Sequence, residues 1–210
     1  MFLHYIWDFD GTLFDSYPHM AFSFQRALND LGYSQTTDEI LLHMKTSTST
    51  CIRYYQEKYG LGEELREKYK YYEDNEIIVP IKPFPYVRDV LSKIVELGGK
   101  NYLYTHRDKK AMEYIRESNL DGFFHGAITS DDKFPLKPAP DAILYLMDKY
   151  NMDPNTVIMV GDRDIDILSG HNANISGCLF DPDNFFPHIE VEYRVKSMRE
   201  FEKVLLDKQG

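Results

Sequence analysis

The sequence is poor in cysteine and has no long apolar run. Its two cysteines, Cys51 and Cys178, are far apart and do not have the spacing of metal ligands, which excludes a disulfide framework and a zinc site. We expect both to be buried thiols in a reducing compartment. No stretch approaches the roughly 18 apolar residues of a membrane span, and the chain reaches Asp8 before an apolar signal core could form. These features predict a cytoplasmic protein.

The chain also has fewer basic than acidic side chains. The chain has 24 basic and 34 acidic side chains, a formal net charge of -10, which argues against general binding to nucleic acid or to an anionic membrane. A small anionic substrate stays possible because a metal ion, a lysine or a helix N-terminus can attract it locally. With 43% hydrophobic residues among 210, the chain can form a sizeable core, and its size suits a monomer or a weak homodimer.

Short apolar runs alternate with segments of helical period over most of the chain. This alternation predicts a doubly wound parallel α/β sheet, in which ligands bind beyond the C-terminal ends of the strands. Each run has the composition of a strand buried on both faces. The expected strands are Tyr5-Ile6-Trp7, Tyr102-Leu103-Tyr104, Ala127-Ile128, Val157-Ile158-Met159-Val160 and Cys178-Leu179-Phe180. The expected helices between them are 87–97, 109–118, 140–150 and 165–173.

The strand pattern disappears between residues 16 and 82. Helical patterns replace it at 18–31, 38–44, 48–59 and 63–76, followed by a stiff linker that contains Pro80, Pro83 and Pro85. We therefore predict an α/β core formed by residues 1–15 and 83–210, with an inserted helical subdomain at 16–82.

The first candidate site is Asp8-Phe9-Asp10-Gly11-Thr12, at the end of the first expected strand. Because strand side chains alternate, Asp8 and Asp10 leave the strand on the same side. Two carboxylates that close together favour a bound cation, and Mg²⁺ prefers oxygen ligands of this kind. Gly11 then permits a sharp turn.

Three further positions follow other expected strands or precede helices. Thr105 follows the second strand, where a hydroxyl and free backbone N–H groups can hold phosphate oxygens. Lys137, in a proline-rich loop, can bind phosphate as a compact positive charge. Gly161 and Asp162 follow the buried run at 157–160, and Asp166 lies one helical turn further on. Asp162 is a candidate metal ligand.

These four positions, in this order, resemble the motifs of the haloacid dehalogenase (HAD) superfamily over nearly the whole chain. Asp8 to Thr12 match the first motif, Thr105 the second, Lys137 the third, and Asp162 with Asp166 the fourth. The helical insert resembles the C1 cap of subfamily IA. The run Lys137-Pro138-Ala139-Pro140-Asp141 is similar to the phosphoglycolate phosphatase and β-phosphoglucomutase branch. The resemblance implies a Rossmann-like core and a Mg²⁺-dependent phosphotransferase with an aspartyl-phosphate intermediate.

The resemblance also implies roles for the acidic residues. Asp8 would attack phosphorus, and Asp10 would protonate the leaving alkoxide and then deprotonate the attacking water. Asp8, the backbone carbonyl of Asp10 and Asp162 would hold Mg²⁺. Asp166 would orient Lys137 or a metal-bound water. The expected reaction is the hydrolysis of a small phosphorylated metabolite.

The remaining assignments concern the substrate. Thr105 and Lys137 would bind the transferring oxygens. Further candidate substrate-binding residues lie in the first motif, after Thr105 and in the insert: Gly11, Thr12, His106, His19, Lys45 and Arg53. The presence of His106 and Arg107 after Thr105 departs from the small or amide residues often found there. Asp164 is an additional acid with no assigned role.

Other functions stay open. A sugar-phosphate mutase of the β-phosphoglucomutase type would share every core motif, and His19 and Arg53 are its best supports. Phosphonate hydrolysis would need a Schiff-base lysine, for which Lys45 is the single candidate. Asp10 argues against a true haloacid dehalogenase, which has no alkoxide to protonate. A non-catalytic binding or regulatory protein of the same fold is a further alternative, disfavoured by the intact acidic residues and Lys137.

Overall fold

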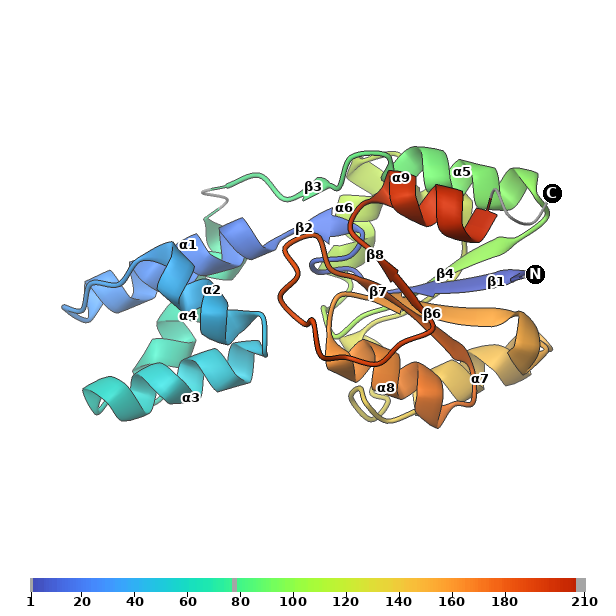
Figure 1. Ribbon diagram of the computed structural model, residues 1–210. Helices are drawn as coiled ribbons and strands as arrows, with labels where there is room; N and C mark the ends of the chain where they lie inside the picture. The colour runs from blue at the N-terminus through green and yellow to red at the C-terminus, as the bar shows by residue number, and fades with distance from the viewer. Residues whose placement is uncertain (1, 77–78, 207–210) are drawn as a thin grey trace. The chain divides into compact units, whose positions relative to one another are not determined.

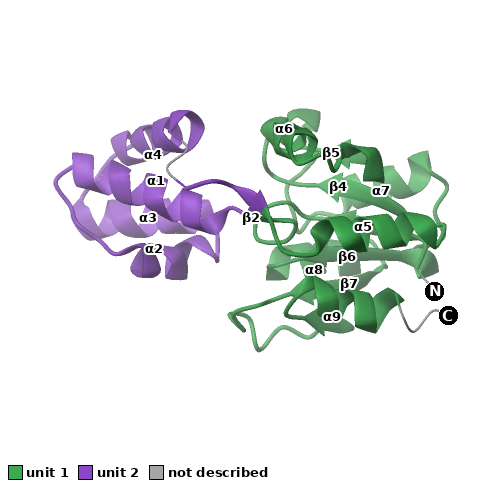
Figure 2. Cartoon of the chain, turned by 90° about the horizontal axis from the view of Figure 1, so that it is seen from above, with its two compact units in different colours: residues 1–14, 83–210 green, residues 15–82 purple. Residues whose placement is uncertain are grey.

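The computed structural model describes residues 2–76 and 79–206. The chain divides into two compact units, residues 1–14 with 83–210 and residues 15–82 (Figure 2). The boundary of the insert lies one residue before the position expected from the sequence. Two short strands at the boundaries, β2 (Phe14–Asp15) and β3 (Lys82–Pro83), form a separate two-stranded sheet.

The larger unit contains a six-stranded sheet in the order β5-β4-β1-β6-β7-β8, and all pairings are parallel. The central strand β1 pairs Trp7 with Leu103 of β4 and with Val160 of β6. The α/β fold with a parallel sheet is therefore confirmed. The strands are β1 (His4–Trp7), β4 (Lys100–Tyr104), β5 (Phe124–Ile128), β6 (Val157–Gly161), β7 (Ser176–Phe180) and β8 (Tyr193–Val195).

Helices cover both faces of this sheet. In Figure 1, α5, α6 and α9 lie on one side and α7 and α8 on the other, so the unit has three layers. Apolar side chains of β1, β4 and β6 are buried between the layers, including Ile6, Tyr102 and Met159. The helices are α5 (Val87–Glu96), α6 (Lys110–Glu117), α7 (Asp141–Lys149), α8 (Asp164–Asn172) and α9 (Met198–Phe201), which continues as a π-helical segment (Glu202–Leu206). Short 3-10 helices occupy Asp121–Phe123, Ser130–Asp132 and Pro154–Thr156.

The edges of the sheet differ from the expectation. The strand expected at Ala127-Ile128 was predicted to be buried on both faces, but it is the end of the edge strand β5, in which Ile128 is buried and Ala127 is exposed. The expectation was wrong because the faces of this edge strand are less completely covered than those of the central strand β6, whose residues are all buried. The sequence pattern also missed β8 and α9, which are short and follow polar segments. Neither contains an apolar run or a helical period long enough to detect.

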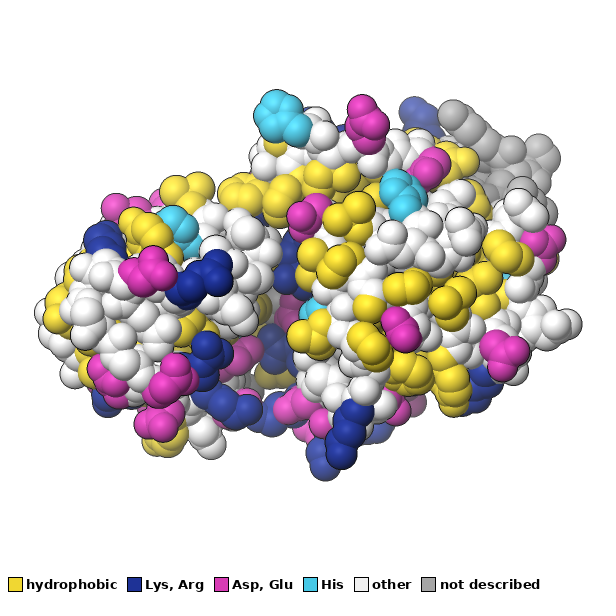
Figure 3. All heavy atoms as spheres, turned by 90° about the horizontal axis from the view of Figure 1, so that it is seen from below, with side chains coloured by type: hydrophobic (Ala, Val, Ile, Leu, Met, Phe, Trp, Pro, Cys, Tyr) yellow, Lys and Arg dark blue, Asp and Glu magenta, His cyan; other side chains and the backbone are white. Residues whose placement is uncertain are grey.

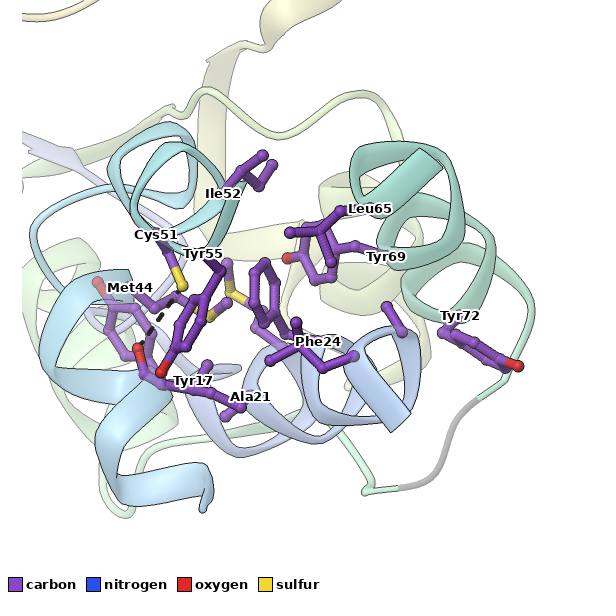
Figure 4. Packing of buried hydrophobic residues seen from close by; sticks show 14 residues of the cluster. Tyr17, Ala21, Phe24, Met44, Cys51, Ile52, Tyr55, Leu65, Tyr69 and Tyr72 are labelled. Atoms are coloured by element: carbon purple, nitrogen blue, oxygen red, sulfur yellow. Dashed lines mark hydrogen bonds between the residues drawn. The ribbon is translucent and has the colours of Figure 1, made fainter. Parts of the chain in front are cut away.

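The smaller unit is a helical bundle with its own core. Its helices are α1 (Tyr17–Asp30), α2 (Thr37–Met44), α3 (Thr48–Tyr59) and α4 (Glu64–Asn75), close to the expected ranges. Phe24 of α1 packs against the rings of Tyr55 and Tyr69, with centroids 5.4 and 5.3 Å away (Figure 4). Cys51 points into this core, where its thiol donates to the carbonyl of Ile40.

Helix ends in this unit have local sequence causes. Thr36 caps α2 through a reciprocal capping box with Glu39, and Ser47 caps α3 by accepting from the backbone N–H of Thr50. Gly60 ends α3 with a φ of 67°, in the left-handed region that glycine adopts without strain. The polar run before α3 therefore serves a structural purpose at that helix start.

Both cysteines are buried free thiols, as expected. Burial raises the pKa of Cys51 to about 12 and also raises that of Cys178. On the face drawn in Figure 3, acidic and basic side chains are interspersed among apolar and neutral ones. Within the described part of the chain, no helix is long and apolar enough to cross a membrane.

Candidate active site

The site lies in the larger unit, where β1 ends. The backbone N–H of Asp8 donates to the carbonyl of Val160 at 2.9 Å, which extends the pairing of β1 with β6 by one residue. The Asp8 side chain is thereby held beside the end of β6, the strand that leads into Asp162. Both aspartates are buried, at 2% and 7% exposure. The parallel sheet thus brings together carboxylates that are more than 150 residues apart in sequence.

A tight turn follows Asp8. The carbonyl of Phe9 accepts from the backbone N–H groups of Leu13 and Phe14 at 3.1 and 3.0 Å, and the rings of Phe9 and Phe14 stack. Gly11 has a φ of 73°, in the left-handed region that glycine adopts without strain. The turn buries Thr12 and fixes where the Asp10 side chain emerges.

Lys137 lies between two carboxylates. Its ammonium donates to Oδ1 of Asp8 at 2.8 Å, to Oδ1 of Asp166 at 2.7 Å and to the carbonyl of Tyr104 at 2.8 Å. These three acceptors match the three N–H bonds of an ammonium group. The three contacts offset the cost of burying this charge, because every donor is satisfied and two of the acceptors are anionic.

The shared ammonium sets the ionisation of the cluster. Burial raises the pKa of Asp8 to about 6, against the opposing effect of Lys137. Burial disfavours the charge on Asp166 as well, but Lys137 and Arg163 outweigh it and lower the pKa of Asp166. Burial would lower the pKa of Lys137, yet Asp166 and Asp8 raise it. Lys137 is therefore charged at neutral pH.

Three buried carboxylates could hold a metal ion. Asp8, Asp162 and Asp166 each offer an oxygen, and these oxygens all lie within 4.8 Å of one another. Asp8 Oδ2 is buried and has no hydrogen-bond partner among the described residues. An unsatisfied buried carboxylate oxygen is costly, and a hard divalent cation would satisfy it. The donor set fits Mg²⁺ in its chemistry.

Asp166 differs from the other two carboxylates. Its Oδ1 accepts from Lys137, and its Oδ2 accepts from the backbone N–H of Arg163 at 3.1 Å in the capping box of α8. Both oxygens thus already have protein donors. Gly161 leaves room for this side chain, since a Cβ there would lie 2.2 Å from the Cβ of Asp166. This geometry supports Asp166 as the residue that orients Lys137.

The side chain of Asp10 is paired with Arg107. Arg107 Nε donates to Oδ1 and Oδ2 of Asp10 at 3.1 Å each, and Nη2 donates to Oδ1 at 2.9 Å. The Arg107 side chain is 10% exposed and the Asp10 side chain 21% exposed. Both carboxylate oxygens of Asp10 therefore already accept hydrogen bonds from Arg107. The predicted contact of Asp10 with a metal ion would involve its backbone carbonyl.

Thr105 and His106 follow β4 directly. Thr105 is buried, and its Oγ1 accepts from the backbone N–H of Arg107 at 3.0 Å. His106 Nε2 accepts from the backbone N–H of Lys137 at 2.8 Å, so the ring is neutral in this arrangement. Burial lowers the pKa of His106 to about 4, and the nearby charge of Lys137 acts in the same direction. His106 thus positions the Lys137 loop, while its predicted contact with substrate stays a prediction.

The other predicted substrate residues belong to the smaller unit. His19 is buried on α1, and its Nε2 lies 3.2 Å from the carbonyl of Glu73. Lys45 follows α2 and lies over the ring of Tyr17, and Arg53 is exposed on α3. Their contact with substrate also stays a prediction. Asp164, the unassigned acid, is exposed at the start of α8.

Two arginines were missed as site residues. Arg107 contacts Asp10, and Arg163 lies beside Asp162, with Nε 3.9 Å from Oδ1. Arg163 also favours the charged forms of Asp8 and Asp166. Arg107 is the third residue after β4 and Arg163 the second residue after β6, and these positions near the strand ends are the signal that could have identified them.

The sequence of this chain matches a known family model over residues 5–180. That family is described as haloacid dehalogenase-like hydrolase. The chain is a haloacid dehalogenase-like hydrolase. The match covers most of the core together with the helical insert and confirms the resemblance inferred from the four motifs. Solved structures agree with this assignment. A hydrolase from Streptococcus pneumoniae TIGR4 is 30% identical, with a TM-score of 0.69 and coverage of 97% of this chain and 98% of that one.

Other haloacid dehalogenase-like proteins are similar to this hydrolase. One from Agrobacterium tumefaciens superposes with a TM-score of 0.84 over the full length of both chains, at 19% identity, and shows the same fold. A phosphoglycolate phosphatase from Vibrio parahaemolyticus is 29% identical over 189 residues, 81% of this chain and 78% of the relative. A pyrophosphatase, PpaX, from Bacillus pumilus is 28% identical over 170 residues, 80% of this chain and 78% of the relative.

Proposed function

We propose that this hydrolase is a Mg²⁺-dependent phosphatase that cleaves a small phosphomonoester through a phosphoaspartate on Asp8. The observation that carries the proposal is the buried contact of Lys137 with Asp8 and Asp166, beside the orphaned Oδ2 of Asp8. A carboxylate with one free oxygen next to a fixed ammonium can attack a phosphorus atom whose oxygens that ammonium neutralises. The relatives named as phosphoglycolate phosphatase and pyrophosphatase support phosphoryl transfer.

The proposed reaction has two steps, and each uses named side chains of the larger unit. One oxygen of the Asp8 carboxylate forms the bond to phosphorus as the bond from phosphorus to the leaving oxygen breaks, and Asp10 gives that oxygen a proton. Asp10 then takes a proton from water, which attacks phosphorus, releases inorganic phosphate and restores the Asp8 carboxylate. Thr105 and Lys137 bind the transferring oxygens. Splitting hydrolysis into two steps lowers a barrier that is very high in water.

Asp8, Asp162 and the backbone carbonyl of Asp10 would hold the cation. When bound, Mg²⁺ supplies positive charge that neutralises the oxygens of the transferring group and the carboxylates around it. Asp166 keeps Lys137 in place, and His106 holds the backbone of the Lys137 loop through its hydrogen bond. The helical insert, with His19, Lys45 and Arg53, is assigned to recognition of the leaving group.

The leaving group is expected to be small and anionic. Phosphoglycolate and pyrophosphate, after which the two relatives are named, both carry a second anionic group next to the scissile phosphoryl group. The partner of this protein is therefore a phosphorylated metabolite, and the acidic surface argues against nucleic acid or an anionic membrane as partners. We assign the protein to the cytoplasm, as a monomer or weak homodimer.

Phosphate release tests the proposal. The wild type, Asp8→Asn and a matched surface variant, Asp148→Asn, are assayed with phosphoglycolate, hexose phosphates and nucleoside monophosphates, in Mg²⁺ and in EDTA. The expected result is release in Mg²⁺ by the wild type and Asp148→Asn, and none in EDTA or by Asp8→Asn. Thermal unfolding checks that Asp8→Asn is folded. Multiple turnovers by a folded Asp8→Asn variant would refute the nucleophile, and isomerised sugar phosphate without free phosphate would indicate a mutase.

A further inference from the structure

The guanidinium of Arg107 covers the carboxylate of Asp10. Three hydrogen bonds of 2.9 to 3.1 Å join the two groups, and they engage both oxygens of Asp10. Both oxygens of Asp10 accept from Arg107, so an oxygen that carries the proton for a leaving group has to give up a bond to the guanidinium. The leaving oxygen of a substrate has to reach the same carboxylate in order to receive a proton. Arg107 and the leaving oxygen therefore compete for Asp10.

The backbone of Arg107 is fixed, so the side chain is the part that can move. Its N–H donates to Thr105 Oγ1 at 3.0 Å, and its carbonyl accepts from the backbone N–H of Ser130 at 3.0 Å. The guanidinium also lies over the ring of Phe9, with 5.7 Å between the Cζ atom and the ring centroid. Rotation about the side-chain bonds would release Asp10 and leave the backbone around Thr105 in place.

Moving a mostly buried guanidinium off its carboxylate has a cost. The Arg107 side chain is 10% exposed, and a buried charge that loses its anionic partner is strongly destabilised. A second anion at the same place would replace the lost bonds, because guanidinium binds carboxylate and phosphate oxygens with the same planar geometry. A neutral group would not compensate for the loss.

We propose that Arg107 selects substrates whose leaving group carries a second anionic group, a carboxylate or a phosphate, two or three bonds from the scissile oxygen. This inference rests on the proposed phosphatase function. The second anion draws Arg107 away from Asp10, and the Asp10 carboxyl group, in its protonated form, then gives its proton to the leaving oxygen. Arg107 thus couples recognition of the leaving group to access to Asp10.

A pair of matched esters tests the selectivity. Phosphoglycolate and 2-hydroxyethyl phosphate have similar leaving groups that differ in bearing a carboxylate or a neutral hydroxyl. The ratio of their kcat/KM values is measured for the wild type, Arg107→Gln, Arg107→Lys and the surface control Arg116→Gln. We expect Arg107→Gln to lower the ratio by about 10- to 100-fold, the range for hydrogen bonds to a charged group. The ratio for Arg107→Lys should lie between those of the wild type and Arg107→Gln, and Arg116→Gln should keep the wild-type ratio.

A merely structural role for Arg107 would lower both kcat/KM values by the same factor and leave the ratio unchanged. That result overturns the inference while the phosphatase proposal stands. Because the ratio requires turnover, the same discrimination is also measured by calorimetric binding of two compounds that are not hydrolysed. These are 3-phosphonopropionate, which replaces the bridging oxygen of phosphoglycolate by a methylene, and propylphosphonate, which lacks the carboxylate.

We expect the wild type to bind 3-phosphonopropionate at least about 10-fold more tightly than propylphosphonate, and Arg107→Gln to bind the two alike. If no ester is hydrolysed but this difference is present in the wild type and lost in the variant, the phosphatase proposal fails and the role of Arg107 as an anion selector stands. If the wild type binds the two phosphonates equally, or binds neither, the inference is overturned whatever the ester assays give.

Discussion

Lys137 Nζ lies 2.7 Å from Oδ1 of Asp166, and both side chains are completely buried. The same ammonium contacts Asp8 at 2.8 Å. One positive charge therefore serves two carboxylates within the core of the larger unit. The cluster of Lys137, Asp8 and Asp166 is stable only while all three side chains are present, because neither carboxylate would have a cationic partner in the core without the ammonium. The stability of this unit and its proposed chemistry consequently depend on the same three side chains.

Removing the ammonium should destabilise the protein. In Lys137→Met, Asp8 and Asp166 remain buried without their shared cation, and we expect the free energy of unfolding to fall by about 3–5 kcal/mol. Urea denaturation at pH 7 measures this, and phosphate release should be lost as well. The control is Lys196→Met, an exposed lysine whose replacement should change stability by less than about 0.5 kcal/mol. Equal stability of the two variants would contradict the prediction.

Gly161 should tolerate no side chain. A Cβ at this position would lie 2.2 Å from Cβ and 2.4 Å from Cγ of Asp166, and that carboxylate cannot move without leaving Lys137. We expect Gly161→Ala to lower the free energy of unfolding by about 1–3 kcal/mol or more. The matched variant is Gly122→Ala, where a Cβ would meet nothing within 4 Å. The prediction is wrong if both alanine variants unfold at the same urea concentration.

His106 should make stability depend on pH. Its pKa is about 4 in the folded protein and 6.5 in the unfolded chain, because burial disfavours the charged ring. The unfolded state therefore binds more protons between these values, and the contribution of His106 to stability is complete above pH 6.5 and is lost as pH falls towards 4. Between pH 7 and pH 5 the loss should be about 1–2 kcal/mol, allowing for the partial exposure of the ring.

The comparison variant for this effect is His106→Gln, whose amide oxygen can still accept from the Lys137 backbone but does not titrate in this range. Urea unfolding of both proteins at pH 7 and pH 5 gives the two differences in free energy. The wild type should lose more stability than the variant over this interval. Identical losses of stability in the two proteins would mean that the protonation of His106 does not differ between the folded and the unfolded state.

Much of the core fold could be predicted from the sequence. The buried strands β1, β4, β6 and β7 are short apolar runs, and the helices α5, α6 and α7 have a clear apolar period. The pattern failed at the edges. Side chains of β5 are half exposed, and Tyr193-Arg194-Val195 of β8 contains no apolar run. At an edge, pairing depends on the neighbouring strand more than on the strand's own composition.

The candidate site was predictable where residues follow a strand directly. Asp8, Thr105 and Asp162 lie at the ends of adjacent parallel strands, so their closeness follows from the topology. The contact of Arg107 with Asp10 did not follow. An arginine side chain can reach many positions, and its choice of partner depends on the turn made by Gly11 and on the packing of Phe9. Such pairings are decided by side-chain geometry rather than by spacing in the sequence.

The central position of β1 has a consequence for biosynthesis. This strand is translated before both of its neighbours, which pair with it through residues 100–103 and 157–160. At roughly 5–20 residues per second, a ribosome needs about 8–30 s to travel from residue 7 to residue 157. For that time the apolar segment Tyr5-Ile6-Trp7 has no strand on its β6 side, and an unpaired apolar strand readily associates with other chains. The segment 5–7 therefore stays open to such association until residues 157–160 have been synthesised.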